Sequence, residues 1–268
     1  MESLITALLI LAAAFQASQP SYPVRWTRAV GPPSRRVLKA KLKMPVNHPP
    51  GQRMYEHTGR KREIRTCVDY LRAKRNNWSD EANGFERATE GFFKEQCYAP
   101  LLILAARPSR ISYVKNFKLN EAALDLLPPS MSFTPVGELE EKADEAERQG
   151  LSWKKFKPGL KLLKKGADWI AVEEPSESRI ELHIKAFGDF NGDGVEDVLL
   201  FKSDRAIGGT FHADYPVVLT RVVADGPLKA FEINDADVEK AATAVMHAGP
   251  DTGPKRAGQK RANQWRKL

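Results

Sequence analysis

The feature that most constrains the fold of this chain is a change in the spacing of its apolar residues near Gly150. Before that glycine the apolar residues recur mainly at helical spacing, and after it the period shifts toward two, as is typical of strands. Six strand-like segments follow with short breaks, at 160–164, 169–173, 180–187, 198–202, 216–223 and 228–233. Because no long helical crossover separates them, an antiparallel meander is predicted. Helices that precede strands predict an α+β fold, in which an N-terminal helical part packs with a C-terminal β-meander.

The helical part is expected to span residues 64–150. Helices are predicted at 67–77, 85–98, 121–127, 135–149 and, after the strands, 236–247. Pro100 should end or kink the second of these, because it lacks the N–H that would bond back to Gln96. Thr134 is the expected N-cap of the helix at 135–149, and Pro135 occupies its first position.

Residues 189–197 form the one segment whose chemistry can be read directly. Oxygen-bearing side chains stand at its positions 1, 3, 5 and 9, which are Asp189, Asn191, Asp193 and Asp197. Ca²⁺ prefers six to eight oxygen ligands, and a tight loop can bring alternate side chains onto one ion. Gly194 permits the sharp turn, and the backbone carbonyl of Val195 is the natural ligand at position 7. The segment therefore predicts a calcium site in a long hairpin between two strands.

The same segment resembles a known family motif. An EF-hand would need a glutamate at position 12, where this chain has Leu200. The string at 188–198 instead resembles the calcium loop of FG-GAP or VCBS-type repeats, in which the ligands correspond to the four side chains named above. Such repeats usually tile a β-propeller, but one copy of about ten residues is found here. The resemblance thus implies the metal site and its strand–loop–strand context, and no propeller. The alternative is an Asx-rich turn that binds no ion.

The N-terminus and the cysteines both indicate export. Residues 4–15 are apolar, too few to span a bilayer and of the length found in secretory signals, so residues 1–17 are expected to be a signal peptide. A misplaced start and an uncleaved anchor are the alternatives, because the segment before it lacks Lys and Arg. No membrane-spanning segment is expected beyond residue 17. Cys67 and Cys97 are predicted to form a disulfide between two antiparallel helices, the alternative being two buried thiols. A secreted or periplasmic protein is expected.

Charge is divided unevenly along the chain. The net charge is +8, yet residues 21–66 contribute +10 and residues 251–268 contribute +5, so the body between them is acidic. Both ends are rich in Pro and Gly, and 18–63 and 249–268 are therefore predicted to be mostly disordered, as a linker and a tail. They flank a single α+β domain at 64–248, helical at 64–150, β-rich at 151–235 and closed by a helix at 236–247. No nucleic-acid motif accompanies the charge, so nucleic acid is not the expected partner.

The irregular segment 205–214 is a candidate binding or catalytic edge near the metal loop. Paired glycines allow close approach of the backbone, and polar groups follow them; the residues concerned are Gly208, Gly209, Thr210, His212 and Asp214. The alternative is a flexible hairpin connection. His183 is expected on an exposed strand face, and Glu173, Glu174 and Glu177 are expected to be solvated.

The chain contains none of the catalytic motifs with a clear mechanism, such as a nucleophile elbow, a His-Glu-x-x-His helix or a phosphate-binding loop. A calcium-stabilised, non-enzymatic binding protein is therefore expected, with a protein partner at the cell envelope, as an inhibitor, immunity or accessory factor. One alternative is an envelope hydrolase in which Ca²⁺ orders Gly208 and Gly209 while His212 or Asp214 transfers a proton. Another is a protein that attaches to an anionic polymer through its basic ends.

Overall fold

The computed structural model describes residues 21–31, 34–46, 52–55, 61–78, 84–133 and 137–247. The predicted signal peptide and C-terminal tail lie outside the described residues, as do Thr134 and Pro135. In the described part, N-terminal helices pack against a C-terminal antiparallel sheet, so the predicted α+β class is confirmed. None of the helices found there is long and apolar enough to cross a lipid bilayer.

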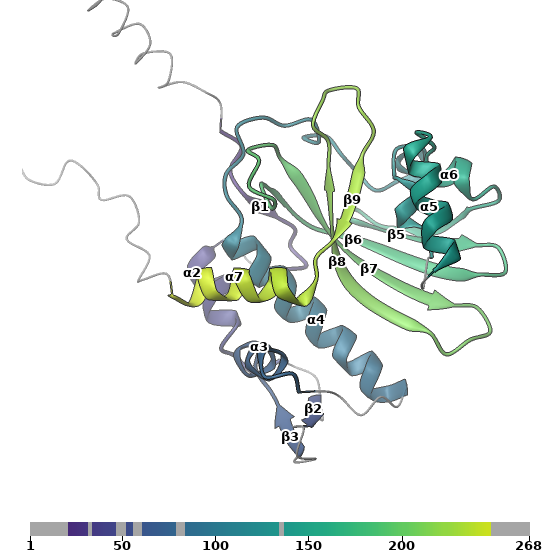
Figure 1. Cartoon of the computed structure of the whole chain (residues 1–268). Coiled ribbons are helices and arrows are strands. Elements are labelled where there is room, and N and C mark those ends of the chain that lie inside the picture. The colour runs from purple at the N-terminus through teal and green to yellow at the C-terminus, as the bar shows by residue number, and fades with distance from the viewer. Residues whose placement is uncertain are drawn as a thin grey trace, which may run out of the picture.

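The sheet is the predicted meander, with every neighbouring pair antiparallel. Its strands, in spatial order, are β4 (Lys161–Lys165), β5 (Trp169–Glu174), β6 (Ser178–Gly188), β7 (Asp197–Ala206), β8 (His212–Thr220) and β9 (Lys229–Glu232). A short strand that the periodicity did not indicate, β1 (Arg25–Trp26), pairs with the last residues of β6, beyond the point where β5 ends. Figure 1 shows β1 at the left of the sheet, opposite α5 and α6.

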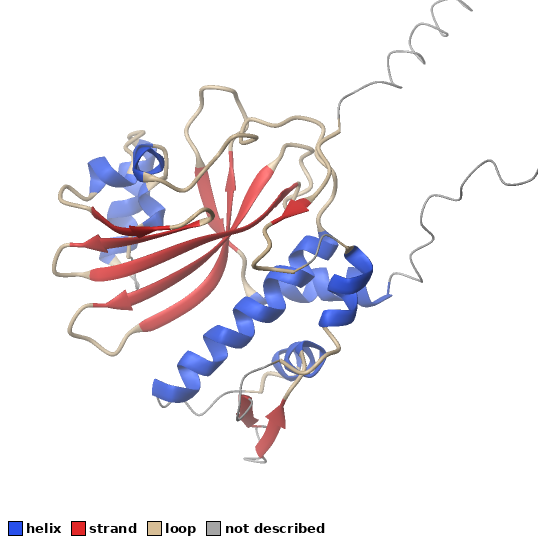
Figure 2. Cartoon of the chain, turned by 180° about the vertical axis from the view of Figure 1, so that it is seen from behind, coloured by secondary structure: helices blue, strands red, loops and turns tan. Residues whose placement is uncertain are grey.

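The helices are α2 (Arg35–Lys41), α3 (Cys67–Arg75), α4 (Gly84–Ala105), α5 (Glu138–Arg148), α6 (Trp153–Phe156) and α7 (Asp235–His247). Two 3₁₀ turns, η1 (Glu121–Asp125) and η2 (Pro129–Met131), precede α5, and a small hairpin, β2 (Gln52–Tyr55) with β3 (Lys61–Ile64), precedes α3. The long helix α4 lies along one face of the sheet, as Figure 2 shows from behind. Predicted helices are therefore present within a few residues of their expected bounds, except at the end of α4.

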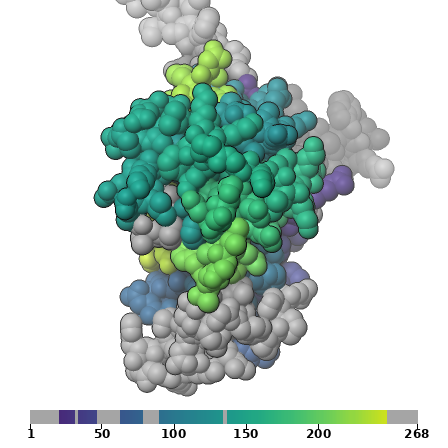
Figure 3. Space-filling view, turned by 90° about the vertical axis from the view of Figure 1, so that its right-hand side faces the viewer, coloured from purple at the N-terminus to yellow at the C-terminus, as the bar shows by residue number. Residues whose placement is uncertain are grey.

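The sheet is buried on both faces, and successive residues of β7 and β8 belong to different cores. Leu199 and Val218 face a core built with α2, α3, α4 and α7. Their neighbours Val198 and Leu219 face a second core, built with the segment from Val114 to Phe133 and with Trp153 of α6. In Figure 3 the elements of this second layer, in teal, form a continuous surface on that side of the molecule. Enclosure on both faces also buries polar side chains of these strands, such as Lys202, Ser203 and Asp204 of β7.

A bulge in β6 corrects one predicted face. The alternation of apolar residues with polar ones predicts that Ile180, Leu182, Ile184 and Ala186 share one face of the strand. The register of β6 against β7 shifts between Ile184 and Ala186. The first three residues lie in the second core, and Ala186 lies in the first. An extra residue in one strand turns every later side chain to the opposite face.

The predicted end of the second helix is also wrong. Helix α4 continues through Pro100 to Ala105. A proline inside a helix costs about 3 kcal/mol through its missing hydrogen bond and its ring. The four residues after it, Leu101 to Leu104, are all buried, and this burial offsets that cost. Arg35 of α2 then satisfies the end of the helix by donating hydrogen bonds to the carbonyls of Ile103 and Leu104.

Part of the predicted linker is folded, which corrects its assignment as a mostly disordered segment. Val30, Leu38 and Leu42 are buried in the first core. The Ser34 side chain caps α2 by accepting from the backbone N–H of Val37. Packing extends further back still, because Tyr22 exchanges two backbone hydrogen bonds with Ser109. The periodicity did not predict this folded part, because the three buried apolar residues are widely spaced among many Lys and Arg.

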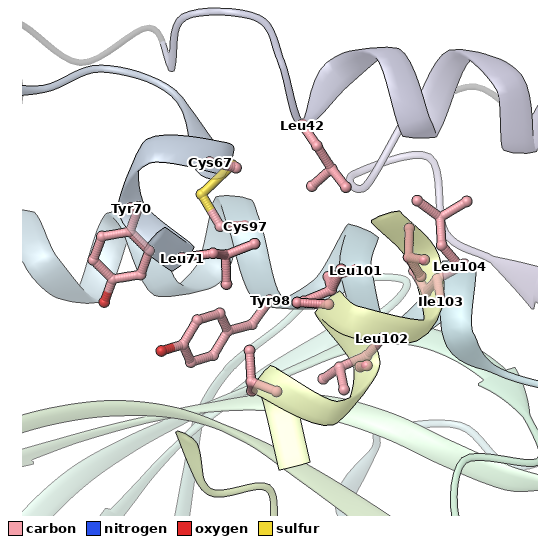
Figure 4. Close-up of a cluster of buried hydrophobic side chains, with 14 of the residues drawn as sticks. Leu42, Cys67, Tyr70, Leu71, Cys97, Tyr98, Leu101, Leu102, Ile103 and Leu104 are labelled. Carbon is pink, nitrogen blue, oxygen red and sulfur yellow. A yellow bond between two sulfur atoms is a disulfide. The ribbon is translucent and has the colours of Figure 1, made fainter. Parts of the chain in front are cut away.

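The predicted disulfide joins Cys67, at the start of α3, to Cys97 in α4. Both residues are almost fully buried, beside Tyr70 and Leu101. Figure 4 shows the bond at the edge of this cluster, above the aromatic and leucine side chains. It therefore fixes α3 against the helix on which the first core is built.

We expect Cys97→Ser to lower the melting temperature by about 10 °C. A bridge across 30 residues is worth about 3–4 kcal/mol on the chain-entropy model, and roughly 2–4 °C accompany each kcal/mol in a chain of this size. Calorimetry of the oxidised protein and of the variant measures the difference. The control is wild type treated with a reductant, which should match the variant. Two alkylatable thiols in native, exported protein would contradict the bond.

Candidate metal centre

The predicted calcium loop joins the end of β6 to the start of β7, as expected. Its outer side is held by the segment that follows α4. Asp189 and Arg107 exchange two backbone hydrogen bonds, of 3.0 and 3.1 Å. Further along, Arg110 donates to the carbonyl of Gly194 over 2.7 Å, and Glu196 donates to that of Ile111 over 2.7 Å. The backbone of the loop is thus held both by the segment that follows α4 and by the two strands that the loop joins.

Inside the loop, the carboxylates accept hydrogen bonds from nearby backbone N–H groups. Asp189 accepts from Gly192 over 2.6 Å and from Gly194 over 3.0 Å. Asp193 accepts from Val195 over 2.7 Å. Positive φ angles of 87° and 84° at Gly192 and Gly194 allow the chain to turn this tightly, because L side chains rarely adopt them.

Asn191 completes this arrangement on the solvent side. Its side-chain oxygen accepts from the N–H of Asp193 over 2.9 Å, and its amide donates to the carboxylate of Asp193 over 3.0 Å. Three of the four predicted ligand side chains, Asp189, Asn191 and Asp193, are therefore oriented by the short loop itself.

Asp197 is the exception among these residues. It is fully buried, and one oxygen accepts from the N–H of Phe190 over 3.0 Å. The other oxygen, Oδ1, is buried and accepts no well-formed hydrogen bond, although the nearby Thr220 hydroxyl interacts with the carboxyl and opposes the rise of its pKa. Burial, together with the charges of Asp193 and Asp189, raises the pKa of Asp197 to about 6. A buried carboxylate oxygen without a well-formed hydrogen bond is costly, and a bound cation is one way to satisfy it.

Glu196 also lies in the loop but points to its other side. It is fully buried and accepts from Ser112 over 2.5 Å. Arg25 of β1 contacts the same carboxylate at 3.4 Å and lies 3.8 Å above the Phe187 ring. Glu196 therefore anchors the loop to β1, and the acid nearest to Asp197 in sequence is engaged away from the predicted ligands.

The donor set of the loop consists of oxygens, as a calcium site requires, and it includes the buried Oδ1 of Asp197. In the ranges the structure describes, however, no three His, Cys, Asp or Glu side chains converge closely enough to enclose an ion. The N–H bonds within the loop account for the present positions of Asp189 and Asp193. The residues fit a cation by chemistry and spacing, and binding one would require the carboxylates of the loop to come closer together.

The loop forms one wall of an open pocket of about 580 Å³. Asp189 and Asn191 line it, so the loop contributes two predicted ligand residues to this wall. The opposite walls are α4, α7 and β9, which contribute mainly apolar side chains such as Leu102, Phe231 and Ala241. The conformation of the loop therefore also determines the shape of this pocket.

The candidate segment 205–214 lies at the other end of the molecule from the calcium loop, which corrects the expectation that the two are neighbours. The calcium loop precedes β7, and Gly208 and Gly209 follow it. Ten strand residues span about 30 Å at 3.3 Å per residue. Figure 1 shows the β7–β8 connection at the lower right and the β6–β7 connection beside β1. Calcium bound at residues 189–197 has no direct contact through which to order Gly208 or Gly209.

His212 and Asp214 lie close together, but not as a catalytic pair. Nε2 of His212 is 2.8 Å from Asp214 and 3.4 Å from the hydroxyl of Ser203. In a Ser-His-Asp relay the carboxylate and the hydroxyl bind different ring nitrogens, and here both meet the same one. Asp214 also packs on α4, where a Cβ on Gly91 would come within 1.9 Å of its carboxylate. These residues position the hairpin against α4. Thr210, like the two glycines, stays on the exposed connection.

A buried polar network was not predicted. Glu174, expected to be solvated, is fully buried and accepts from Ser132 over 2.6 Å and from the Trp153 indole over 2.7 Å. Lys202 is also buried and donates to Asp204 over 2.7 Å and to the carbonyl of Ser132 over 3.1 Å. The network fastens the segment before α5 onto the sheet. The network is buried because both faces of the sheet are covered. That covering depends on residues far apart in the sequence, so a local pattern did not reveal it.

No protein-family model matches this chain, and no similar protein is found among curated proteins or among solved structures. The likeness to FG-GAP or VCBS-type loops is therefore carried by residues 188–198 alone. The sheet that surrounds these residues is a single meander, unlike the repeated blades of a propeller.

We expect Asp197 to make stability depend on pH when metal is removed. Its pKa is raised from 3.8 to about 6, so its stabilising contribution is full below pH 4 and is lost as pH rises through 6. The loss amounts to roughly 3 kcal/mol for a fully buried group. In chelator, Asp197→Asn should be the more stable protein at pH 7, and the difference should vanish near pH 4.

Denaturant unfolding of both proteins across this pH range measures the effect. Asp225→Asn, on an exposed residue of the β8–β9 connection, is the matched control and should follow the wild type. Parallel pH profiles for wild type and Asp197→Asn would contradict the assignment of the raised pKa to Asp197.

Proposed function

We propose that this protein is a secreted or periplasmic binding protein, stabilised by one Ca²⁺ and not an enzyme, that recognises a protein partner at the cell envelope. The observation that carries the calcium assignment is the fully buried carboxylate of Asp197, whose Oδ1 accepts no well-formed hydrogen bond. In this proposal the protein acts on its partner as an inhibitor, an immunity protein or an accessory factor. Each step has its own support among the described residues.

The ligands proposed for Ca²⁺ are Asp189, Asn191, Asp193, the carbonyl of Val195, and Asp197. When bound, the ion would supply positive charge that offsets repulsion among three carboxylates. The backbone of the loop is held by hydrogen bonds to Arg107 and Arg110 without the ion, so that binding would mainly require the ligand side chains to move. Such preorganisation lowers the cost of ordering that binding would otherwise carry.

Export is supported by the bond between Cys67 and Cys97, since disulfides persist mainly in oxidising compartments. The extracellular and periplasmic spaces also hold calcium at concentrations that sites of moderate affinity can use. The disulfide and the proposed calcium site thus point to the same compartment.

Binding of a protein is supported by the tip of the β7–β8 hairpin. Ile207 and Phe211 flank Gly208, Gly209 and Thr210 there, with exposed fractions of 43% and 41%. The Phe211 ring is held in place by an edge contact with Phe133, at 5.2 Å between centroids. A preordered aromatic side chain on a projecting turn suits a protein interface better than a catalytic cleft.

We expect Ca²⁺ to raise the melting temperature by about 3–6 °C. At ten times the dissociation constant the linkage contribution is about 1.4 kcal/mol, and each kcal/mol shifts the midpoint by roughly 2–4 °C. Asp193→Ala should abolish the shift, because it removes an exposed ligand without opening a core cavity. Titration calorimetry and thermal unfolding, with Ca²⁺, Mg²⁺ and chelator, measure both quantities.

Asp225→Ala is the matched control, since it also removes an exposed aspartate, and it should keep the full calcium shift. Mg²⁺ should give a smaller shift, because its compact octahedral shell suits this loop poorly. Absence of calcium uptake by the folded wild type at millimolar concentration would overturn the metal assignment. If Ca²⁺ raised the melting temperature of Asp193→Ala as much as that of the wild type, the calcium site would lie elsewhere in the chain.

A further inference from the structure

The outer face of α2 is basic and partly apolar. Residues 34–46 contain five Lys and Arg and no acidic residue. The inner side of the helix packs in the first core through Leu38 and Leu42. On the outer side, Val37 and Met44 have exposed fractions of 47% and 59%. Two apolar side chains are thus presented to solvent within a strongly cationic stretch.

Not all of the cations in this stretch are available to a partner. Arg35 donates to two carbonyls at the end of α4, and Lys41 donates to the carbonyl of Val30 over 2.8 Å. Lys39 also interacts with another group. The side chains of Arg36 and Lys43 are exposed and make no hydrogen bond or ion pair with another described residue. Arg36 and Lys43 are therefore the charges that this face offers.

A shallow hollow of about 690 Å³ lies on the same face. The residues that line it are Ser34, Arg36, Val37, Ala40, Lys41 and Met44. Three of these residues are apolar and two are cationic. A surface that meets both the acyl region and the charged headgroups of a lipid layer combines residues in this way.

We propose that this α2 face docks on the surface of a phospholipid bilayer that contains anionic headgroups. Arg36 and Lys43 meet the headgroup phosphates, and Val37 and Met44 enter the boundary beneath them. The exposed apolar side chains favour a bilayer over a hydrophilic anionic polymer, which would gain nothing from contact with them. This peripheral attachment adds a location to the proposed binding protein and does not depend on calcium.

The position of the C-terminal helix supports the same partner. In Figure 1 the end of α7 lies at the same left-hand end of the molecule as α2, with α7 nearer the viewer. The sequence from residue 251 onward carries six Lys and Arg against one acidic residue, Asp251. Helix α7, which precedes this basic sequence, ends at His247, at the same end of the molecule as α2. Each basic residue near an anionic membrane adds to the attraction, so the charges of the two regions act together.

Co-sedimentation of the full chain with vesicles tests the proposal. Vesicles of phosphatidylcholine, with and without phosphatidylglycerol, are compared at low and at high salt. Binding is expected only with the anionic lipid and should weaken as salt shortens the screening length. One basic residue contributes about a fivefold change in partitioning, so Arg36→Gln/Lys43→Gln should reduce binding about 25-fold. Val37→Asn/Met44→Gln should reduce it several-fold at unchanged charge.

Lys161→Gln/Lys164→Gln is the matched control. It makes the same charge change at exposed positions of β4, beyond β5 on the far side of the sheet in Figure 1, and should bind as the wild type does. All substituted residues are exposed, and unchanged melting temperatures would verify folding. Equal binding by the α2 variants and the wild type would overturn the proposal, as would binding to polyphosphate or DNA without binding to anionic vesicles.

Discussion

The pairing of β6 with β7 is the interaction on which the rest of the structure depends. The two strands stay in register from Ser178 opposite Ala206 to Gly188 opposite Asp197, with one bulge. Both are enclosed between two cores, so this pair supplies side chains to every layer of the molecule. The calcium loop closes one end of the pair, and the β7–β8 hairpin continues from the other. The separation of the two candidate sites follows from the length of β7.

Much of this architecture could be predicted from the sequence, because it depends on local patterns. Strand periodicity identified all six strands of the meander, and the spacing of Cys67 and Cys97 on helical faces identified their bond. The loop between β6 and β7 was recognisable because its glycines and oxygen-bearing side chains are close in sequence. Its boundaries needed no knowledge of distant residues.

What was not predicted depends on contacts between distant residues. Glu174 and Lys202 look like solvated charges, and they are buried because a second layer covers that face of the sheet. Lys202 then needs Asp204, whose burial raises the pKa of its carboxyl while the lysine opposes that change. Pro100 appeared to end a helix because the packing of the residues after it is not visible in a local window. In each case the burial of side chains against distant residues outweighed the local preference of the sequence for a solvated charge or a helix end.

The end of α4 connects the two surfaces proposed to bind ligands. Arg35 of α2 donates to its last carbonyls, and Arg107, two residues beyond the helix, pairs with Asp189 of the calcium loop. The α2 face and the loop are therefore supported by one short stretch of chain. The disulfide holds the same helix to α3 near its middle. If the loop binds calcium as proposed, α2 would stay in place without the ion, because Arg35 and the core hold it, while the loop would respond to the ion.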